Sequence, residues 1–167
     1  MAPRASVGIP IECEIRPAIS KDVPDIVALW GDLAVHHAVL DPAFAPSANW
    51  QEEYRHFVRN LLDRDDALAV VATSNGQVIG YGVGRVSLLP GFCARRRRGY
   101  IHDVVTRPAH RRRGVGRRLV EALVEWMQAS EVETVELTVA IRNQEALAFW
   151  ADQGFAPYMQ HLKRDLG

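Results

Sequence analysis

The sequence predicts an α/β fold of the mixed α+β type, and three observations support this prediction. The length of 167 residues suits a single core, because chains of roughly 100–200 residues usually form one domain. Hydrophobic residues make up 48% of the chain and recur at strand spacing in some segments and at helical spacing in others. Asn75-Gly76, the strongest short-range hairpin signal, joins two apolar runs and indicates antiparallel pairing. We therefore expect one domain over residues 13–167, preceded by a flexible N-terminal segment over residues 1–12.

The first half of the chain is expected to contain three strands and two helices. A strand over residues 13–16 precedes a helix over residues 22–37, which has a proline near its first turn and apolar residues at helical spacing. A second helix has an apolar face that runs from Tyr54 to Leu62. Apolar and β-branched residues then predict strands over residues 67–73 and 77–88, on either side of the hairpin turn.

The second half is expected to alternate strands with helices. A strand over residues 100–106 leads through an Arg/Gly-rich turn into a long amphipathic helix that ends near residue 130. A strand over residues 134–140 and a helix over residues 143–150 follow, with a glycine placed to end that helix. A last strand is expected over residues 158–164, which makes six strands and four helices in all.

Positive charge is concentrated in one segment of a chain that is neutral overall. Residues 95–118 hold ten arginines and one acidic residue, a net charge of +9, so the rest of the chain carries −9. Such a patch attracts anions and predicts a polyanion or a phosphate-bearing cofactor as partner. Nucleic acid is the less favoured of these, because Tyr100 is the one aromatic residue in the basic stretch and no helix-turn-helix or RNA-binding signature is present. We therefore expect no nucleic-acid partner.

Neither a membrane span, a metal site nor a disulfide framework is expected. The longest apolar run, Ala67 to Ala72, has six residues, whereas a bilayer-crossing helix needs roughly 20. No secretory leader pattern precedes the first strand, so we expect a cytoplasmic protein without membrane contact. Cys13 and Cys93 are too few for a zinc site or a disulfide framework, although one bridge stays open. The adjacent pair His36-His37 lacks further ligands at metal-binding spacing, so no metal is predicted.

The turn over residues 111–117 has the features of a phosphate-binding site. A strand that ends in a glycine-spaced turn and leads into a helix leaves the first helical N–H groups unpaired, and the helix dipole adds positive charge there. Glycines let the backbone approach a pyrophosphate, and flanking arginines supply charge-assisted hydrogen bonds. The segment matches neither the Walker loop nor the dinucleotide-binding fingerprint. In the alternative interpretation the arginines form a solvated face and the glycines only relax a turn.

Three segments of the sequence carry family motifs in a fixed order: residues 100–120, 136–143 and 146–155. An acyl-CoA signature of Arg or Gln followed by x-x-Gly-x-Gly or Ala falls on Arg111, Gly114 and Gly116. A later Asn-x-x-Ala pattern that ends in Gly-Phe falls on Asn143, Ala146, Gly154 and Phe155. With these motifs the chain resembles the GNAT superfamily of N-acetyltransferases.

The resemblance implies both a fold and an acyl donor. The fold is a mostly antiparallel, twisted central sheet of six to seven strands with one splayed parallel pair, here 100–106 and 134–140, flanked by about four helices. The donor is acetyl-CoA, with its pantetheine arm along the first of these strands and its pyrophosphate on the turn that follows. The cofactor-binding residues implied are Val104, Val105, Thr106, Arg111, Arg112, Arg113, Gly114, Val115, Gly116, Arg117 and Asn143.

Transfer of an acetyl group to an amine requires a neutral nitrogen, because a lysine-like amine with a pKa near 10.4 is only about 0.04% neutral at pH 7. Strand alternation places Tyr100, His102 and Val104 on one face and Asp103 on the other. In relatives that use histidine, the positions that match Tyr100 and His102 face the amine. His102 is therefore the candidate base and Tyr100 a second catalytic candidate, while an ordinary strand histidine is the alternative. Asp103 is expected to cap a turn or orient a neighbour.

The expected acid differs from the family pattern. Trp150 stands where the family often has a tyrosine that protonates the leaving sulfur, and an indole N–H does not readily release its proton. Trp150 is kept as a catalytic candidate that packs against the thioester or donates a hydrogen bond to the sulfur. Tyr158 and Tyr100 remain open as substitutes. A backbone N–H near Val104 or Val105, where the strand bulges, is expected to stabilise the oxyanion.

The predicted function is transfer of an acetyl group from acetyl-CoA to a primary amine of a small molecule, by direct attack in a ternary complex. The resemblance and the charges suggest Asp41 for an ammonium group and Arg85 for a carboxylate, with Phe44 and Tyr81 as further acceptor-binding residues. The alternatives are a protein or peptide N-acetyltransferase and a noncatalytic CoA-binding or nucleic-acid-binding module. The role of residues 95–98 and the formation of a homodimer stay open.

Overall fold

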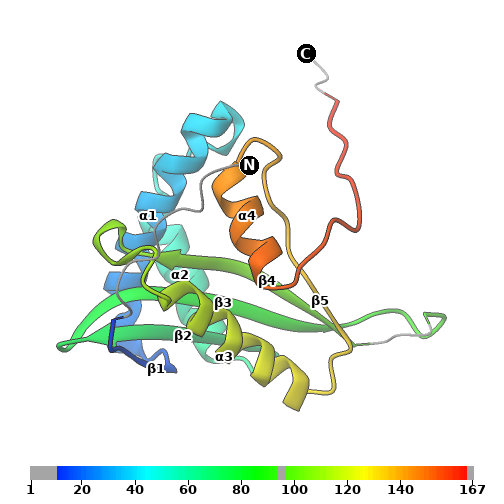
Figure 1. The fold of residues 1–167 in the computed structure, drawn as a ribbon, viewed down its shortest axis with the longest axis horizontal. Helices are drawn as coiled ribbons and strands as arrows, with labels where there is room; N and C mark the ends of the chain where they lie inside the picture. Colours follow the sequence, from blue (N-terminus) through cyan, green and yellow to red (C-terminus); the bar gives the residue numbers. More distant parts are fainter. Residues whose placement is uncertain (1–10, 94–96, 165–167) are drawn as a thin grey trace.

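The computed structural model describes residues 11–93 and 97–164, and its described part contains five strands and four α-helices (Figure 1). Most of the N-terminal segment expected to be flexible lies outside the described residues, as do Arg95 and Arg96. The start of the domain at residue 13 stays a prediction. The elements are β1 (Glu14–Pro17), α1 (Val23–Leu40), α2 (Trp50–Leu62), β2 (Ala67–Ser74), β3 (Gln77–Leu88), β4 (Arg97–Thr106), α3 (Val115–Ala129), β5 (Thr134–Glu136) and α4 (Gln144–Asp152).

The strands form one mixed sheet in the order β1-β2-β3-β4-β5. The pairs from β1 to β4 are antiparallel, and β4 pairs with β5 in parallel. The predicted hairpin is confirmed between β2 and β3, where Asn75 has a φ of 50° and Gly76 a φ of 76°. Two successive residues with positive φ match the twist of the flanking strands, which is why Asn-Gly predicts this turn.

The parallel pair separates after three residue pairs, as the resemblance implied. β5 is matched to β4 only at Arg98↔Thr134, Gly99↔Val135 and Tyr100↔Glu136. Residues 137–140 then leave the ladder, so the strand expected over 134–140 is shortened to three residues, while β4 continues to Thr106. The Tyr100 hydroxyl lies 2.7 Å from Thr138 Oγ1 and bridges the two diverging segments.

The strand predicted over residues 158–164 is wrong, and the described sheet has five strands rather than six to seven. The segment is irregular and exposed, with Tyr158 79%, Met159 80% and Leu162 91% accessible. Figure 1 shows it running away from the sheet toward the C-terminus. A strand requires a neighbouring strand for its backbone hydrogen bonds, and an apolar pattern alone does not supply one.

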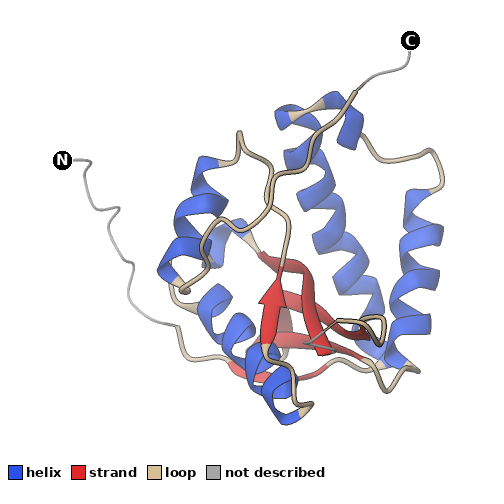
Figure 2. Cartoon of the chain, turned by 90° about the vertical axis from the view of Figure 1, so that its right-hand side faces the viewer, coloured by secondary structure: helices blue, strands red, loops and turns tan. Residues whose placement is uncertain are grey.

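Helices cover both faces of the sheet, and each face has its own core (Figure 2). On one face, α1 and α2 bury Ile26, Leu29 and Val58 against the sheet. On the other face, α3 buries Leu119, Leu123 and Met127, and α4 adds partly buried aromatic residues. Alternate glycines of β3 let α3 approach closely. A Cβ built on Gly84 would lie 2.7 Å from Met127 Cε.

The segment Ser20–Leu40, which contains α1, is the one described helix long and apolar enough to cross a membrane by length and composition. The expectation from uninterrupted apolar runs missed it, because a helix interrupted by aspartate and glycine can still be apolar on average. In the structure Val23, Ile26, Val27 and Leu29 of this helix are buried in the core against α2 and the sheet. A core helix of a soluble protein passes the same test.

Candidate active site

A bulge in β4 controls which side chains reach the candidate site. Val83 is matched to Asp103 and Gly84 to Ile101, which leaves His102 as an extra residue of β4. Ile101 and Val104 pack on the α3 side, whereas Val105 packs on the α1/α2 side. The expectation that Val104 shares a face with His102 and that Asp103 lies opposite is therefore wrong. A bulge changes the alternation of side chains along a strand, and it turns Asp103 toward α2.

His102 lies between two aromatic rings on the α2 side of the sheet. The centroid of its ring is 5.0 Å from that of Tyr100 and 6.4 Å from that of Phe57 in α2. Partial burial lowers the pKa of His102 below 6.5, and the positive charge of Arg85 lowers it further. The imidazole is consequently neutral at pH 7 and able to accept a proton.

Next to His102 lies a buried chain of three polar groups that sequence analysis did not connect. The Tyr54 hydroxyl donates to Asp103 Oδ2 at 2.8 Å and lies 3.0 Å from the Tyr81 hydroxyl. Burial raises the pKa of Asp103 and raises the pKa values of Tyr54 and Tyr81 well above 10. Tyr81, predicted to contact the acceptor, is 0% exposed and reaches the site only through Tyr54. Tyr81 therefore has no exposed surface with which to contact an acceptor.

The variant Tyr54→Phe is expected to raise the pKa of Asp103, because the Tyr54 hydrogen bond holds it down against the effect of burial. The loss of a buried hydrogen bond should also cost about 1–3 kcal/mol of unfolding free energy. NMR titration of the Asp103 carboxyl carbon and chemical denaturation would measure the two effects. Tyr81→Phe, which keeps the bond to Asp103, is the control and should move the pKa of Asp103 less. An Asp103 titration unchanged by Tyr54→Phe would contradict the assignment.

The turn between β4 and α3 has the backbone of an anion-binding site. Arg112 has a φ of 59° and Gly114 a φ of 86°, and Gly114 is the N-cap of α3. The N–H of Arg118 bonds to the carbonyl of Gly114, so the N–H groups of residues 115–117 precede the first helical bond. Left-handed residues next to a helix N-terminus form a concave set of N–H donors. A Cβ on Gly116 would lie 3.3 Å from the Phe149 ring, so this position is closely packed.

Arginines of this turn connect it to its surroundings. Arg111 Nε donates to the carbonyl of Thr106 at 3.3 Å, and Arg112 pairs with Glu145 of α4 at 3.3 Å. The structure thus brings together the predicted cofactor-binding residues at the end of β4, the turn and the first turn of α4. Arg113 belongs to the same turn, and Arg117 lies in the first turn of α3.

Asn143 is the N-cap of α4, and Trp150 lies further along the same helix. Asn143 Oδ1 accepts a hydrogen bond from the N–H of Ala146 at 3.0 Å, so the side chain caps α4 and keeps its amide NH₂ as a donor. The Trp150 ring lies 5.0 Å from that of Phe149 and 5.2 Å from that of Phe155. Tyr158, a predicted substitute for the missing acid, lies on the exposed segment beyond Phe155.

A hollow of about 420 Å³ lies between α1, α2 and the loop that joins them. Of the predicted acceptor-binding residues, Phe44 lines this hollow, whereas Asp41, Tyr81 and Arg85 do not. Aromatic residues dominate its lining: Trp30, Phe44, Trp50, Tyr54 and Phe57. Phe57 connects the hollow to His102. Asp41 accepts a hydrogen bond from the N–H of Ala43 at 2.9 Å and caps the 3-10 turn Pro42–Phe44, so part of its hydrogen-bonding capacity is used locally.

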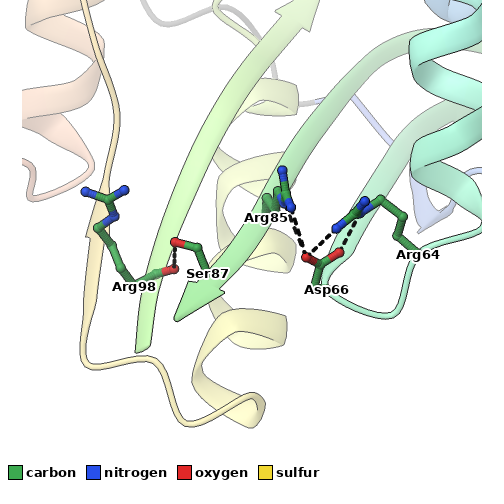
Figure 3. Close-up of polar contacts among 5 residues, drawn as sticks. All are labelled: Arg64, Asp66, Arg85, Ser87 and Arg98. Atoms are coloured by element: carbon green, nitrogen blue, oxygen red, sulfur yellow. Dashed lines mark hydrogen bonds and ion pairs between the residues drawn. The ribbon is translucent and has the colours of Figure 1, made fainter. Parts of the chain in front are cut away.

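Arg85 belongs to a charged cluster at the end of β3 (Figure 3). Its guanidinium lies 3.2 Å from Asp66 Oδ2, while Arg64 makes two bonds to Asp66 at 2.6 and 2.7 Å. The hydrogen bond from Arg64, followed by that from Arg85, lowers the pKa of Asp66 to about 2. Two arginines therefore share one carboxylate, and the cluster has a net positive charge near His102.

The strand expected over residues 100–106 begins three residues earlier, at Arg97. Arg97 donates to the carbonyl of Ser130 at 2.9 Å, and Arg98 pairs with Glu136 at 3.5 Å. Figure 3 also shows the Ser87 hydroxyl directed at the carbonyl of Arg98. Cys13 and Cys93 are both free thiols. Among the described residues no group of three or more His, Cys, Asp or Glu is arranged to hold a metal ion.

Comparison with known proteins finds a family model that matches this chain. The family model described as "Acetyltransferase (GNAT) family" matches residues 33–155. An uncharacterized N-acetyltransferase of Archaeoglobus fulgidus is 26% identical over 84% of this chain and 90% of its own. The N-alpha-acetyltransferase RimI of Mycobacterium tuberculosis is 33% identical over 52% of this chain and 50% of its own.

Solved structures share the fold. The tetramutant of the BH1408 protein of Bacillus halodurans has a TM-score of 0.83 at 21% identity, and the match covers 92% of this chain and 99% of that one. The aminoglycoside N-acetyltransferase AAC(6')-Iy, solved in complex with CoA, has a TM-score of 0.74 at 16% identity, over 99% of this chain and 98% of that one.

Proposed function

Because the chain belongs to the acetyltransferase (GNAT) family, we propose that it moves an acetyl group from acetyl-CoA to a primary amine of a small molecule by direct attack in a ternary complex. The observation that carries the proposal is the combination of a split strand pair with an anion-binding turn at its end. β4 leads from the bulge at His102 directly into that turn, so one continuous segment serves both reactants.

In this proposal acetyl-CoA is bound along β4. The backbone of Val104 to Thr106 pairs with the pantetheine arm where residues 137–140 have left the ladder. The N–H groups of residues 111–117 bind the pyrophosphate, with arginine side chains of the turn neutralising charge. The packing of Gly116 against Phe149 supports this assignment, because only a glycine leaves the backbone exposed there without displacing α4.

The proposed base is His102, directly or through a water molecule. It takes a proton from the ammonium group, and the neutral nitrogen then attacks the thioester carbon. Tyr100, whose ring touches that of His102, orients the imidazole, and its hydroxyl is held by Thr138. A backbone N–H near Val104 or Val105 stabilises the oxyanion of the tetrahedral intermediate.

The leaving thiolate receives a hydrogen bond rather than a proton from the enzyme. Trp150 offers an indole N–H but no transferable proton, and a thiolate with a pKa near 8.5 is a good enough leaving group to depart with this help. As the intermediate collapses to the amide, the nitrogen loses its second proton, which reaches the released CoA thiolate through water. We assign no acid role to Tyr158, because its side chain is 79% exposed.

The aromatic hollow and Arg85 support an acceptor that is a small amine with an apolar part and an anionic group. The deciding experiment is thiol release from acetyl-CoA in a screen of amino acids, polyamines, aminoglycosides and peptides. Turnover with a small amine is the expected result. Turnover with peptides alone would transfer the proposal to protein acetylation, and calorimetric binding of CoA with no turnover for any amine would favour a noncatalytic CoA-binding module.

Replacing Gly114 by valine is expected to weaken CoA binding at least tenfold, because a side chain at a φ of 86° distorts the turn that presents the N–H donors. Calorimetry with CoA would measure the dissociation constant. The matched control is Gly76→Val, since Gly76 has a similar φ of 76° in the distant β2–β3 hairpin. Both variants should lose stability, and equal CoA affinity in the two would rule out the turn as the pyrophosphate site.

A further inference from the structure

Aromatic side chains line the hollow between α1 and α2, and their rings form a row that leads to the proposed base. The Trp30 ring lies 5.2 Å from that of Trp50 and 4.5 Å from that of Tyr54. Tyr54 is followed by Phe57 at 5.6 Å, and Phe57 is followed by His102 at 6.4 Å. One end of a bound molecule can therefore lie against these rings while its amino group reaches the imidazole.

The lining of the hollow offers few free polar groups. Apart from two indole N–H groups, its polar side chains are Ser47, Glu53 and Tyr54, and each is hydrogen-bonded within the protein. The Ser47 hydroxyl donates to Glu53 Oε2 at 3.0 Å, and the Tyr54 hydroxyl donates to Asp103. A polyhydroxylated acceptor such as an amino sugar therefore finds few partners there, which costs binding free energy. An aryl group suits this lining, because aromatic rings pack favourably in offset-stacked or edge-to-face pairs.

Charges at the two ends of this row determine the direction in which an acceptor binds. Glu53 places a carboxylate beside the hollow, whereas Arg85 lies at the other end, opposite Tyr100 in the β3–β4 ladder. Cross-strand partners project from the same face of a sheet, so Arg85 shares the face on which Tyr100 contacts His102. An anionic group of the acceptor is therefore attracted to Arg85 and repelled from the hollow.

The Arg85 guanidinium keeps donors for such a group (Figure 3). Its Nε and Nη2 contact Asp66 Oδ2 at 3.3 and 3.2 Å, and within the described part of the chain its Nη1 has no partner. Arg64 makes the two shorter bonds to the same carboxylate, at 2.6 and 2.7 Å. Asp66 is therefore neutralised mainly by Arg64, which leaves the positive charge of Arg85 available to a carboxylate of the acceptor.

We infer that the acceptor is an α-amino acid with an aryl side chain, such as phenylalanine or tryptophan, and this inference rests on the proposed function. The aryl group packs in the aromatic hollow, the α-carboxylate binds Arg85, and the amino group faces His102. The amino nitrogen bonds to the acetyl carbon as the C–S bond breaks. One ammonium proton passes to His102 and a second reaches the thiolate, so the products are the N-acetyl amino acid and CoA. Because three fixed sites hold three groups of one carbon atom, the site distinguishes the two enantiomers.

A diamine is the competing class of acceptor, because aromatic rings and a carboxylate also attract a cation. Two observations favour the aryl group. Glu53 is exposed to solvent and already accepts a hydrogen bond from Ser47, so it offers a second ammonium group little beyond what water offers. Arg85 adds a positive charge close to the base, and this charge repels an acceptor that carries two cations.

The test compares kcat/KM for thiol release from acetyl-CoA across matched amines. L-phenylalanine or its D-enantiomer should exceed alanine, phenethylamine, glucosamine and 1,5-diaminopentane by about tenfold, because each of these lacks one of the three groups. The two enantiomers should differ by a similar factor. A preference for alanine, glucosamine or 1,5-diaminopentane, or equal values for the two enantiomers, would overturn the inference and leave acetyl transfer itself in place.

Variants assign the aryl group to the hollow. Phe44→Ala should raise KM for phenylalanine by about fivefold relative to that for alanine, and it should cost little stability because Phe44 is 53% exposed. Phe92→Ala, at a position that is 90% exposed and outside the hollow, is the matched control and should leave this ratio unchanged. Arg85→Gln, measured above the acidic limb of the pH profile, should raise KM for phenylalanine more than for phenethylamine. A ratio that Phe44→Ala does not change would remove the aryl group from the hollow.

Calorimetry with CoA-saturated protein separates this inference from the proposed function, because it measures the binding of phenylalanine without turnover. Binding that Phe44→Ala weakens, with no turnover of any amine, would support the assignment of the hollow and contradict acetyl transfer. Turnover of other amines with no binding of phenylalanine would contradict the inference and support acetyl transfer.

Discussion

Replacing His102 by alanine is expected to lower kcat by about 10²–10⁴-fold, the usual contribution of a general base. The affinity for CoA should not change, because the turn over residues 111–117 is separate from the imidazole. Steady-state kinetics with the amine found by the screen, together with CoA calorimetry, would measure both quantities. A kcat within threefold of the wild type would remove His102 from the role of base.

The pH profile gives an independent test of the same residue. Burial and Arg85 hold the pKa of His102 below 6.5, so kcat/KM should rise with pH through that lowered pKa and then level off. His102→Ala should abolish this acidic limb. Arg85→Gln removes the positive charge that disfavours imidazolium, so it should move the limb to higher pH while keeping its shape. A limb that stays in place in both variants would belong to another group.

Replacing Asp22 by asparagine is expected to lower the free energy of unfolding by about 2 kcal/mol, because it leaves Arg16 without its carboxylate partner. Asp22 is 3% exposed, accepts hydrogen bonds from both terminal nitrogens of Arg16 at 2.6 and 2.8 Å, and accepts another from the N–H of Ile19 at 2.9 Å. These bonds join β1 to the turn before α1. Denaturant titration at pH 7 would measure the loss.

The unfolding free energy lost in Asp22→Asn should depend on pH, in the direction set by the pKa of the Asp22 carboxyl. The hydrogen bond from Arg16 lowers its pKa below 3.8 in the folded protein. Its stabilising contribution is therefore complete above the unfolded pKa near 4 and disappears as the pH falls through the folded value. The difference between wild type and variant should shrink accordingly below pH 4. Asp66→Asn, which breaks an exposed pair with two arginines, should change stability little. Equal losses in the two variants would contradict the role of burial.

Features that depend on a few neighbouring residues were predictable from the sequence. The hairpin at Asn75-Gly76 and the start of α3 after Gly114 both rest on local backbone preferences, and both are found. The backbone of the turn over residues 111–116 belongs to the same class, because its glycine spacing is a property of six consecutive residues, while phosphate binding there stays a prediction. The end of the sheet does not belong to this class. Whether residues 158–164 form a strand depends on a neighbouring strand with which they can pair, and an apolar pattern contains no such information.

The interior of the candidate site was not predictable for a similar reason. The bulge, expected near Val104 or Val105, lies at His102, because its position is set by the register between β3 and β4. Tyr54 is 27 residues from Tyr81 and 49 residues from Asp103 along the chain. Each of the three residues also fits the pattern of its own helix or strand. The two tyrosines and the aspartate therefore gave no signal that they share one hydrogen-bonded chain.

The glycines of β3 also determine where α3 lies relative to the end of β4. Because β3 has glycines at alternate positions, α3 packs close to the sheet. The first turn of the helix therefore lies near the end of β4. The height of α3 above the sheet therefore sets the position of its N-terminal turn, the proposed pyrophosphate site, relative to β4. A methyl group added at Gly84, under the C-terminal end of α3, is expected to tilt this helix and so to displace the proposed pyrophosphate site at its N-terminus.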